Sequence, residues 1–198
     1  MFLYNMCNNI TMRKRIIIYL NAPITITFVV ICVIALILQY ITGGTSTTLL
    51  FLTYGSSFLN PFTYIRLIGH IFGHADVMHL LSNMMYILIL GPMLEEKYKD
   101  KLIYVILTTA LVTGIINNIF FPNVKLLGSS GIVFAFILLS SVTGSGKGIP
   151  ITSLIVAALW IGSEIYDMVT IQDNISQITH IIGGITGLLI GLKFKRND

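Results

Sequence analysis

Six apolar runs divide this chain, and they limit its fold more strongly than any other feature. They cover residues 22–41, 77–94, 102–121, 131–143, 149–166 and 175–192. A helix that crosses a bilayer needs about 20 mainly apolar residues. Only 10% of the residues are charged, where a soluble domain carries about 25%. The pattern predicts an all-α, polytopic membrane protein with six transmembrane helices.

The fourth run is too short for a full span. It needs the preceding Gly128-Ser129-Ser130 segment to enter the membrane in non-helical form. Such backbone is tolerated only where it is buried in protein or lines a wet cavity. The short run is therefore the first indication of a site.

The basic residues predict the orientation, because Lys and Arg concentrate on the cytoplasmic side of membrane proteins. In a six-span arrangement only Arg66 and Lys125 fall on the outer side. We therefore expect both termini to be cytoplasmic, with tails at 1–21 and 195–198 around one membrane domain at 22–194. The connection over 42–76 lies outside. It is rich in aromatic and apolar residues, so we expect an ordered, partly helical loop in the membrane interface.

Composition argues against several other classes. The formal charge of +4 comes from basic residues spread between apolar runs, so no nucleic-acid partner is expected. Cys7 and Cys32 suggest neither a disulfide framework nor a metal site. His70 and His74 have helical i, i+4 spacing, but no nearby Cys or Glu completes a zinc pattern. We expect no metal and no cofactor.

A serine between glycines opens the fourth run. Gly128 and Gly131 bracket Ser129 and Ser130. A hydroxyl at a helix N-terminus lies beside unsatisfied N–H groups and the positive end of the helix dipole. Those features suit a nucleophile whose attack creates an oxyanion. The same residues could equally cap a helix and allow close packing.

His180 shares one helix face with glycines in the sixth run. Gly183 and Gly187 follow it at helical spacing. Small residues let helix backbones approach closely, so His180 should face its nearest neighbour and not lipid. Such a histidine can act as a general base for a serine, or it can be a structural histidine bonded to a carbonyl.

His79 and Asn83 lie four residues apart on one face of the second run. Both can donate hydrogen bonds to an oxyanion, or they can join helices as polar contacts. In the six-span arrangement these two residues, Ser130 and His180 reach a similar depth below the outer surface. No carboxylate is placed to orient His180, since Glu164, Asp167 and Asp173 lie nearer the interface. A Ser-His dyad therefore fits better than a triad.

Three motifs, in order and on the right runs, resemble those of the rhomboid intramembrane proteases from about residue 23 to 192. They are Gly128-Ser129-Ser130-Gly131, His79-x-x-x-Asn83 and His180-x-x-Gly183-x-x-x-Gly187. The resemblance makes Ser130 the nucleophile, His180 the general base and acid, and His79, Asn83 and the Ser130 N–H the oxyanion donors. Ser129 takes the family's variable position.

Three further residues match the family pattern less closely. Arg66 resembles the first-loop Arg, although Ile65 replaces the usual Trp before it. Glu95 resembles the acidic residue at the inner end of the second span. Phe134 stands where many members have a Tyr that stacks on the catalytic histidine.

The resemblance implies a serine endopeptidase that cleaves transmembrane helices of membrane proteins near the outer face of the cell's inner membrane. One alternative is a catalytically inactive rhomboid-like protein that binds transmembrane clients. A transporter or channel is a third class, but it needs a continuous polar path, and here the polar groups gather near one face. Substrate, cleavage site and oligomeric state stay undetermined from the sequence.

Overall fold

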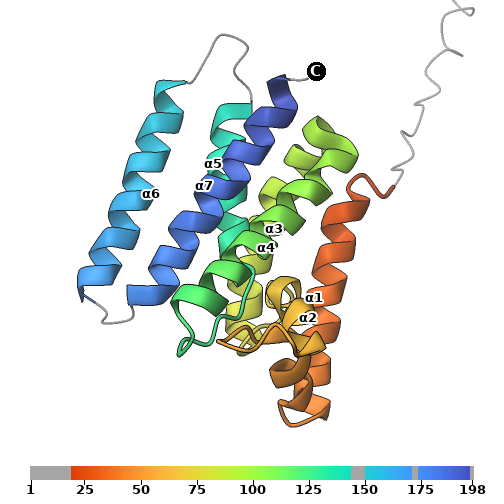
Figure 1. Ribbon diagram of the computed structural model, residues 1–198. Coiled ribbons are helices and arrows are strands. Elements are labelled where there is room, and N and C mark those ends of the chain that lie inside the picture. Colours follow the sequence, from red (N-terminus) through yellow and green to blue (C-terminus); the bar gives the residue numbers. More distant parts are fainter. Residues whose placement is uncertain (1–18, 144–149, 171–173, 197–198) are drawn as a thin grey trace, which may run out of the picture.

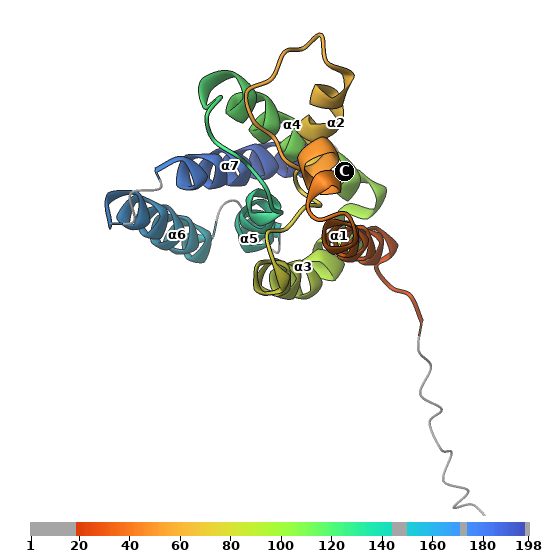
Figure 2. The same ribbon diagram turned by 90° about the horizontal axis from the view of Figure 1, so that it is seen from below.

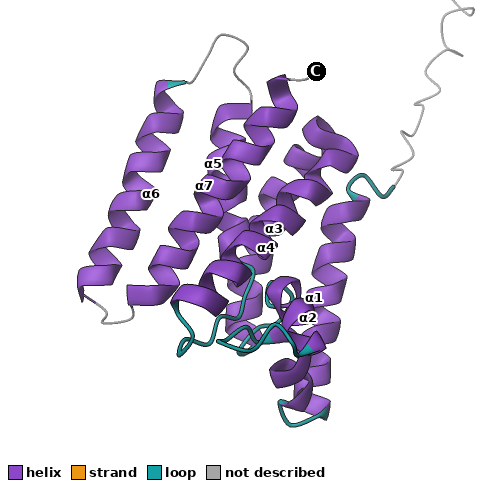
Figure 3. Ribbon diagram, in the orientation of Figure 1, coloured by secondary structure: helices purple, strands orange, loops and turns teal. Residues whose placement is uncertain are grey.

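The computed structural model describes residues 19–143, 150–170 and 174–196, and over these residues it is helical (Figures 1 and 3). The expected all-α class is therefore confirmed there. The elements are α1 (Pro23–Ile41), η1 (Thr47–Phe51), α2 (Pro61–Gly69), α3 (Val77–Tyr98), η2 (Lys99–Lys101), α4 (Leu102–Phe120), α5 (Ser130–Thr143), α6 (Ile151–Thr170) and α7 (Asn174–Arg196).

Each predicted apolar run corresponds to a helix, with ends that differ by a few residues. Three segments of the described chain are long and apolar enough to cross a membrane: Pro23–Ile41, Val77–Phe120 and Gln177–Phe194. The second holds both α3 and α4. Ser130–Thr143 and Ile151–Gly162 are shorter apolar helices. The chain is thus a helical membrane protein, and α7 extends to Arg196, past the expected end of the membrane domain at 194.

Glu95 ties α3 to the beginning of α1. Helix α1 starts at Pro23, and its N-cap residue Ala22 offers no side-chain acceptor. Instead, the Glu95 carboxylate accepts the N–H groups of Ile24 at 2.7 Å and Thr25 at 2.8 Å. It also accepts the Thr25 hydroxyl at 2.7 Å. A carboxylate at a helix N-terminus satisfies unpaired donors and complements the dipole. Glu95 therefore has a structural place, far along α3 from His79.

The loop between α1 and α3 is ordered and partly helical, as expected. Asn60 caps α2 by accepting the Phe62 N–H at 3.0 Å. Arg66 is buried, donates to Ser56 Oγ at 2.9 Å and lies 4.5 Å from the centroid of the Tyr54 ring. Arg66 thus holds the loop together.

Helix α5 lies inside the bundle, and α6 lies at its edge (Figure 2). Helix α5 contacts α3, α4, α6 and α7. Its buried side chains are Ile132, Val133, Ala135, Phe136, Leu138, Leu139 and Val142. Helices α3, α5 and α7 all begin at the end of the bundle where α2 lies (Figure 1).

Glycines bring α7 against α5. A Cβ added to Gly183 would lie 2.9 Å from the Gly131 Cα and 3.0 Å from its carbonyl oxygen. One turn on, a Cβ on Gly187 would clash with the Ala135 Cβ and lie 3.1 Å from its Cα. The glycine face predicted for the sixth run therefore packs backbone against backbone, as small residues allow in membrane helices.

Candidate active site

Ser130 and His180 form a hydrogen-bonded pair across the α5–α7 contact. The Ser130 Oγ lies 2.7 Å from the His180 Nε2. Ser130 is the first residue of α5, and His180 lies in the second turn of α7. Both side chains are partly buried. Gly131 follows Ser130 by one position, and Gly183 follows His180 by three. The close approach of these two glycines brings the helices near enough for Ser130 and His180 to form a hydrogen bond.

The Gly128-Ser129 segment before α5 is non-helical and held by backbone bonds, as the short fourth run predicts. Gly128 has φ +122, a conformation that favours glycine. Its N–H donates to the His70 carbonyl at 2.9 Å. Thr53 and Leu126 exchange two backbone hydrogen bonds, at 3.0 and 2.8 Å. The loop between α1 and α3 therefore fixes the chain that leads to Ser130.

His79 lies against this segment with one ring nitrogen as a donor. The Ala75 N–H donates to His79 Nδ1 at 3.3 Å, so the proton of the neutral ring is on Nε2. A Cβ on Gly128 would lie 2.8 Å from both the Cε1 and the Nε2 of His79. Only glycine leaves room for the imidazole there, and its Nε2–H lies next to the turn that carries Ser130.

Asn83 lies on the same side of α3, one turn further on. Its Nδ2 donates to the His79 carbonyl at 3.1 Å. The same Nδ2 would be 3.9 Å from a Cβ on Gly128. One amide hydrogen thus stabilises α3, and the Asn83 amide still borders the Gly128 turn. The structure brings together Ser130, His180, His79 and Asn83, the four residues predicted for the site.

Phe134 contacts the His180 ring. Their centroids are 4.9 Å apart, with an interplanar angle of 46°. On its other side Phe134 meets Trp160 of α6, with centroids 4.5 Å apart at 32°. The expected stacking of Phe134 is therefore present as a tilted contact. Trp160, which the sequence did not single out, supports it.

His70 and His74 use their ring nitrogens within the protein. The His70 Nδ1 lies 3.3 Å from the Arg66 carbonyl oxygen, and its Nε2 lies 3.2 Å from the Thr113 Oγ1. Burial lowers the pKa of each of these two histidines to about 4, so both rings are neutral. Among the described residues, no three His, Cys, Asp or Glu side chains are grouped to hold a metal ion.

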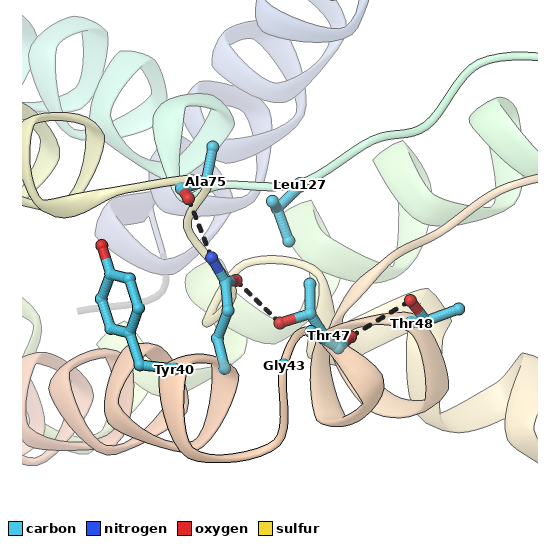
Figure 4. A pocket seen from close by; sticks show the side chains of 8 residues that line it. Tyr40, Gly43, Thr47, Thr48, Ala75 and Leu127 are labelled. Carbon is cyan, nitrogen blue, oxygen red and sulfur yellow. Dashed lines mark hydrogen bonds between the residues drawn. The ribbon is translucent and has the colours of Figure 1, made fainter.

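A small cavity of about 10 Å³ lies behind the dyad, which is roughly the space of one water. Its polar side chains are those of His70, Thr109, Thr113, Ser130, Thr179 and His180. A larger hollow of about 480 Å³ lies at the C-terminal end of α1, beside Leu127 (Figure 4). There the Gln39 amide links the Ala75 carbonyl, at 2.8 Å, to the Thr47 hydroxyl, at 2.7 Å.

Some predicted features fall outside this description. Asp173 lies outside the described residues, and so do residues 1–18 and 197–198 of the two expected tails. Sequence reasoning considered His74 only as a zinc ligand and missed its contact with the serine motif, where its Nε2 lies 3.3 Å from Ser129 Oγ. No local pattern signals that contact, which joins residues 55 positions apart.

Comparison with known proteins agrees with the resemblance in the motifs. The family described as Rhomboid domain matches residues 61–197. A protein named Rhomboid protease GlpG from Yersinia pestis (strain Pestoides F) is 28% identical over 183 residues, which cover 89% of this chain and 64% of the relative. Its namesake from Yersinia enterocolitica serotype O:8 is 26% identical over 182 residues, with the same coverage. The chain therefore spans less than two thirds of the length of these relatives, at 64%. With the family match over most of its length, the chain belongs to the rhomboid family.

Proposed function

We propose that this chain is an intramembrane serine endopeptidase that cleaves transmembrane segments of membrane proteins with a Ser130–His180 dyad. The observation that carries the proposal is the 2.7 Å contact between Ser130 Oγ and His180 Nε2. A nucleophile needs a base within that distance. The name of the relatives, Rhomboid protease GlpG, supports the same activity.

The chemistry follows from the positions of the groups. His180 takes the hydroxyl proton as Ser130 Oγ attacks the peptide carbonyl, and the oxyanion forms near the Ser130 N–H. The His79 Nε2–H and the Asn83 amide are the additional donors. His180 then gives its proton to the leaving amine, and an acyl-enzyme remains. A water attacks the ester with His180 again as base, releasing the second fragment and restoring Ser130. The cavity beside the dyad is a suitable place for that water.

The membrane arrangement in this proposal has six spans: α1, α3, α4, α5, α6 and α7. The excess of Lys and Arg between spans on one side favours cytoplasmic termini. The resemblance to the rhomboid proteases favours an inner-membrane location. The dyad then lies near the outer face, and the loop with α2 rests in the outer interface. A substrate helix must unwind there, because its carbonyls are otherwise hydrogen-bonded. Residues with low helix propensity near its outer end favour cleavage.

The test is cleavage of a tagged single-span substrate by the protein reconstituted in liposomes. Ser130→Ala and His180→Ala should produce no fragments. Ser140→Ala is the matched control, since Ser140 lies on the same helix and donates only to the Ile137 carbonyl of its own helix, at 2.9 Å. It should cleave like the wild type.

Two other outcomes would contradict the proposal. Cleavage that survives Ser130→Ala would remove Ser130 from the role of nucleophile. If the wild type neither cleaves the substrate nor reacts with a fluorophosphonate at Ser130, the chain is an inactive rhomboid-like protein that binds transmembrane clients. Retention of client binding by Ser130→Ala would then support that second function.

A further inference from the structure

Ser129, beside the proposed nucleophile, is fully buried at 0% exposure. It directly precedes α5, where a serine hydroxyl ordinarily accepts an N–H from the first turn of the helix. Here the first-turn N–H groups of Ile132 and Val133 go to the Ser129 backbone carbonyl, at 2.9 and 3.0 Å. The Ser129 hydroxyl is directed away from the helix, to His74 Nε2 at 3.3 Å.

The direction of this hydrogen bond follows from the second nitrogen of His74. His74 Nδ1 lies 3.2 Å from the Phe72 carbonyl, which can only accept, so Nδ1 carries the proton. Nε2 of the neutral ring then has a lone pair, and Ser129 is the donor. Burial keeps the ring neutral, since it lowers the pKa of His74 to about 4. His74 is itself at 0% exposure, so water does not compete for the bond.

His74 also contacts the proposed oxyanion donor. The rings of His74 and His79 meet edge to face, with centroids 5.0 Å apart at 69°. His79 on its other side meets Gly128, where an added Cβ would be 2.8 Å from the ring. The adjacent residues Gly128 and Ser129 are therefore each in contact with one ring of a packed histidine pair.

We propose that Ser129 is a positioning residue in this chain, whose hydrogen bond to His74 sets the distance between the Ser130 turn and His79. This inference rests on the proposed peptidase function. It gives a role to a position that the motif resemblance treats as variable. Ser129 need not touch the substrate, because it acts through His74 and through the backbone that it shares with Ser130.

The test compares Ser129→Ala with the wild type in liposomes, by turnover of a single-span substrate and by the rate of Ser130 acylation with a fluorophosphonate. Loss of one buried hydrogen bond at a positioned site should lower kcat and the acylation rate about tenfold. KM should stay within about twofold, since the substrate contacts are unchanged. A merely structural role would lower the folded fraction instead, and rates are therefore normalised to folded protein.

Two further comparisons keep the inference falsifiable if Ser129→Ala folds poorly. Ser129→Thr and Ser129→Val have nearly the same volume and differ in the hydroxyl, so Thr should acylate faster than Val. In the His74→Phe background, Ser129→Ala should cause no further loss of acylation rate, because both substitutions remove the same hydrogen bond.

The inference would be overturned by Ser129→Ala acylating within twofold of the wild type. Equal rates for Thr and Val, or independent losses in the double variant, would overturn it as well. Failure of the proposed function is a separate result, visible as a wild type that is neither active nor labelled at Ser130. Normal wild-type activity with an unaffected Ser129→Ala removes this inference alone.

Discussion

Helices α5 and α6 are neighbours, yet they are held in different ways. Helix α5 is surrounded by α3, α4, α6 and α7, and the backbone of α7 touches its backbone at Gly131. Helix α6 contacts α5 and α7 at the edge of the bundle. Among its described side chains Ser153 and Trp160 are buried, whereas Ile151, Leu154, Ile155, Leu159, Ile165 and Tyr166 are exposed.

The difference shows which part of the site is rigid. Two backbones in contact cannot move apart without losing packing all along the helix, so the position of Ser130 relative to His180 is closely determined. Helix α6 is attached through side chains, chiefly Trp160 against Phe134 and Gly184. Side chains can change rotamer, so α6 can shift while the dyad keeps its geometry. Glycine substitutions test this contrast directly, because each glycine faces a different kind of neighbour.

The largest effect is expected for Gly183→Ala. Its Cβ would lie 2.9 Å from the Gly131 Cα, and a backbone atom cannot rotate away. Helices α5 and α7 must separate, and a displacement of about 1 Å at the dyad costs roughly 100-fold in rate. Acylation of Ser130 by a fluorophosphonate measures this loss. If the Gly183→Ala variant is acylated at the wild-type rate, α5 and α7 are not rigidly joined at the Gly131–Gly183 contact.

A smaller effect is expected for Gly187→Ala, one turn away from Gly183. Its Cβ would clash with the Ala135 Cβ, at a distance from the dyad. Overpacking of this kind costs about 1–3 kcal/mol in the free energy of unfolding. The thermal unfolding midpoint in detergent should fall accordingly.

The compensating variant sharpens the Gly187 prediction. Gly187→Ala with Ala135→Gly removes the clashing methyl and leaves the 3.1 Å approach to the Ala135 Cα. The double variant should recover part of the fall in the unfolding midpoint that Gly187→Ala causes. If the two substitutions simply add, residues 135 and 187 do not touch in the membrane.

The third prediction concerns Gly184→Ala, at a position that faces α6. The added Cβ would lie 2.6 and 2.9 Å from two carbon atoms of the Trp160 ring. The ring is a side chain on the less constrained helix, so we expect α6 to give way, at a cost of about 1 kcal/mol in the free energy of unfolding. Acylation should fall only a few-fold, through the shared contact of Trp160 with Phe134. Adding Trp160→Phe to Gly184→Ala should restore the unfolding midpoint. If Gly184→Ala lowers the acylation rate as much as Gly183→Ala does, α6 is as rigid as α5.

The sequence predicted the features that depend on local spacing. The helices follow apolar runs, and the His180–Gly183–Gly187 face follows the helical repeat. The pairing of Ser130 with His180 was predicted from the motifs and from a similar depth, since Ser130 begins one helix and His180 lies near the start of another that runs in the same direction. These predictions needed no knowledge of how the loops fold.

The contacts that the sequence did not predict depend on loop geometry. The Ser129–His74 bond requires the turn at Phe72 and the attachment of Gly128 to His70. The tautomer of His79 depends on the hydrogen bond from the Ala75 N–H, which lies in the loop before α3. The capping of α1 by Glu95 joins residues about 70 positions apart. A single sequence records residue types at these positions, and the distances between them arise only in the folded chain.

The smallest effect, and one of opposite sign, is expected for Gly162→Ala in α6. No atom lies within 4 Å of a Cβ at Gly162, so the methyl meets open space. Alanine in a helix interior is favoured over glycine by about 0.5–1 kcal/mol, so the unfolding midpoint should rise slightly and acylation should stay unchanged. This variant adds the same methyl as Gly183→Ala, and therefore separates the effect of a methyl from the effect of its surroundings. A fall in the midpoint would mean that the exposed face of α6 packs against another molecule in the membrane, and α6 would then be held as firmly as α5.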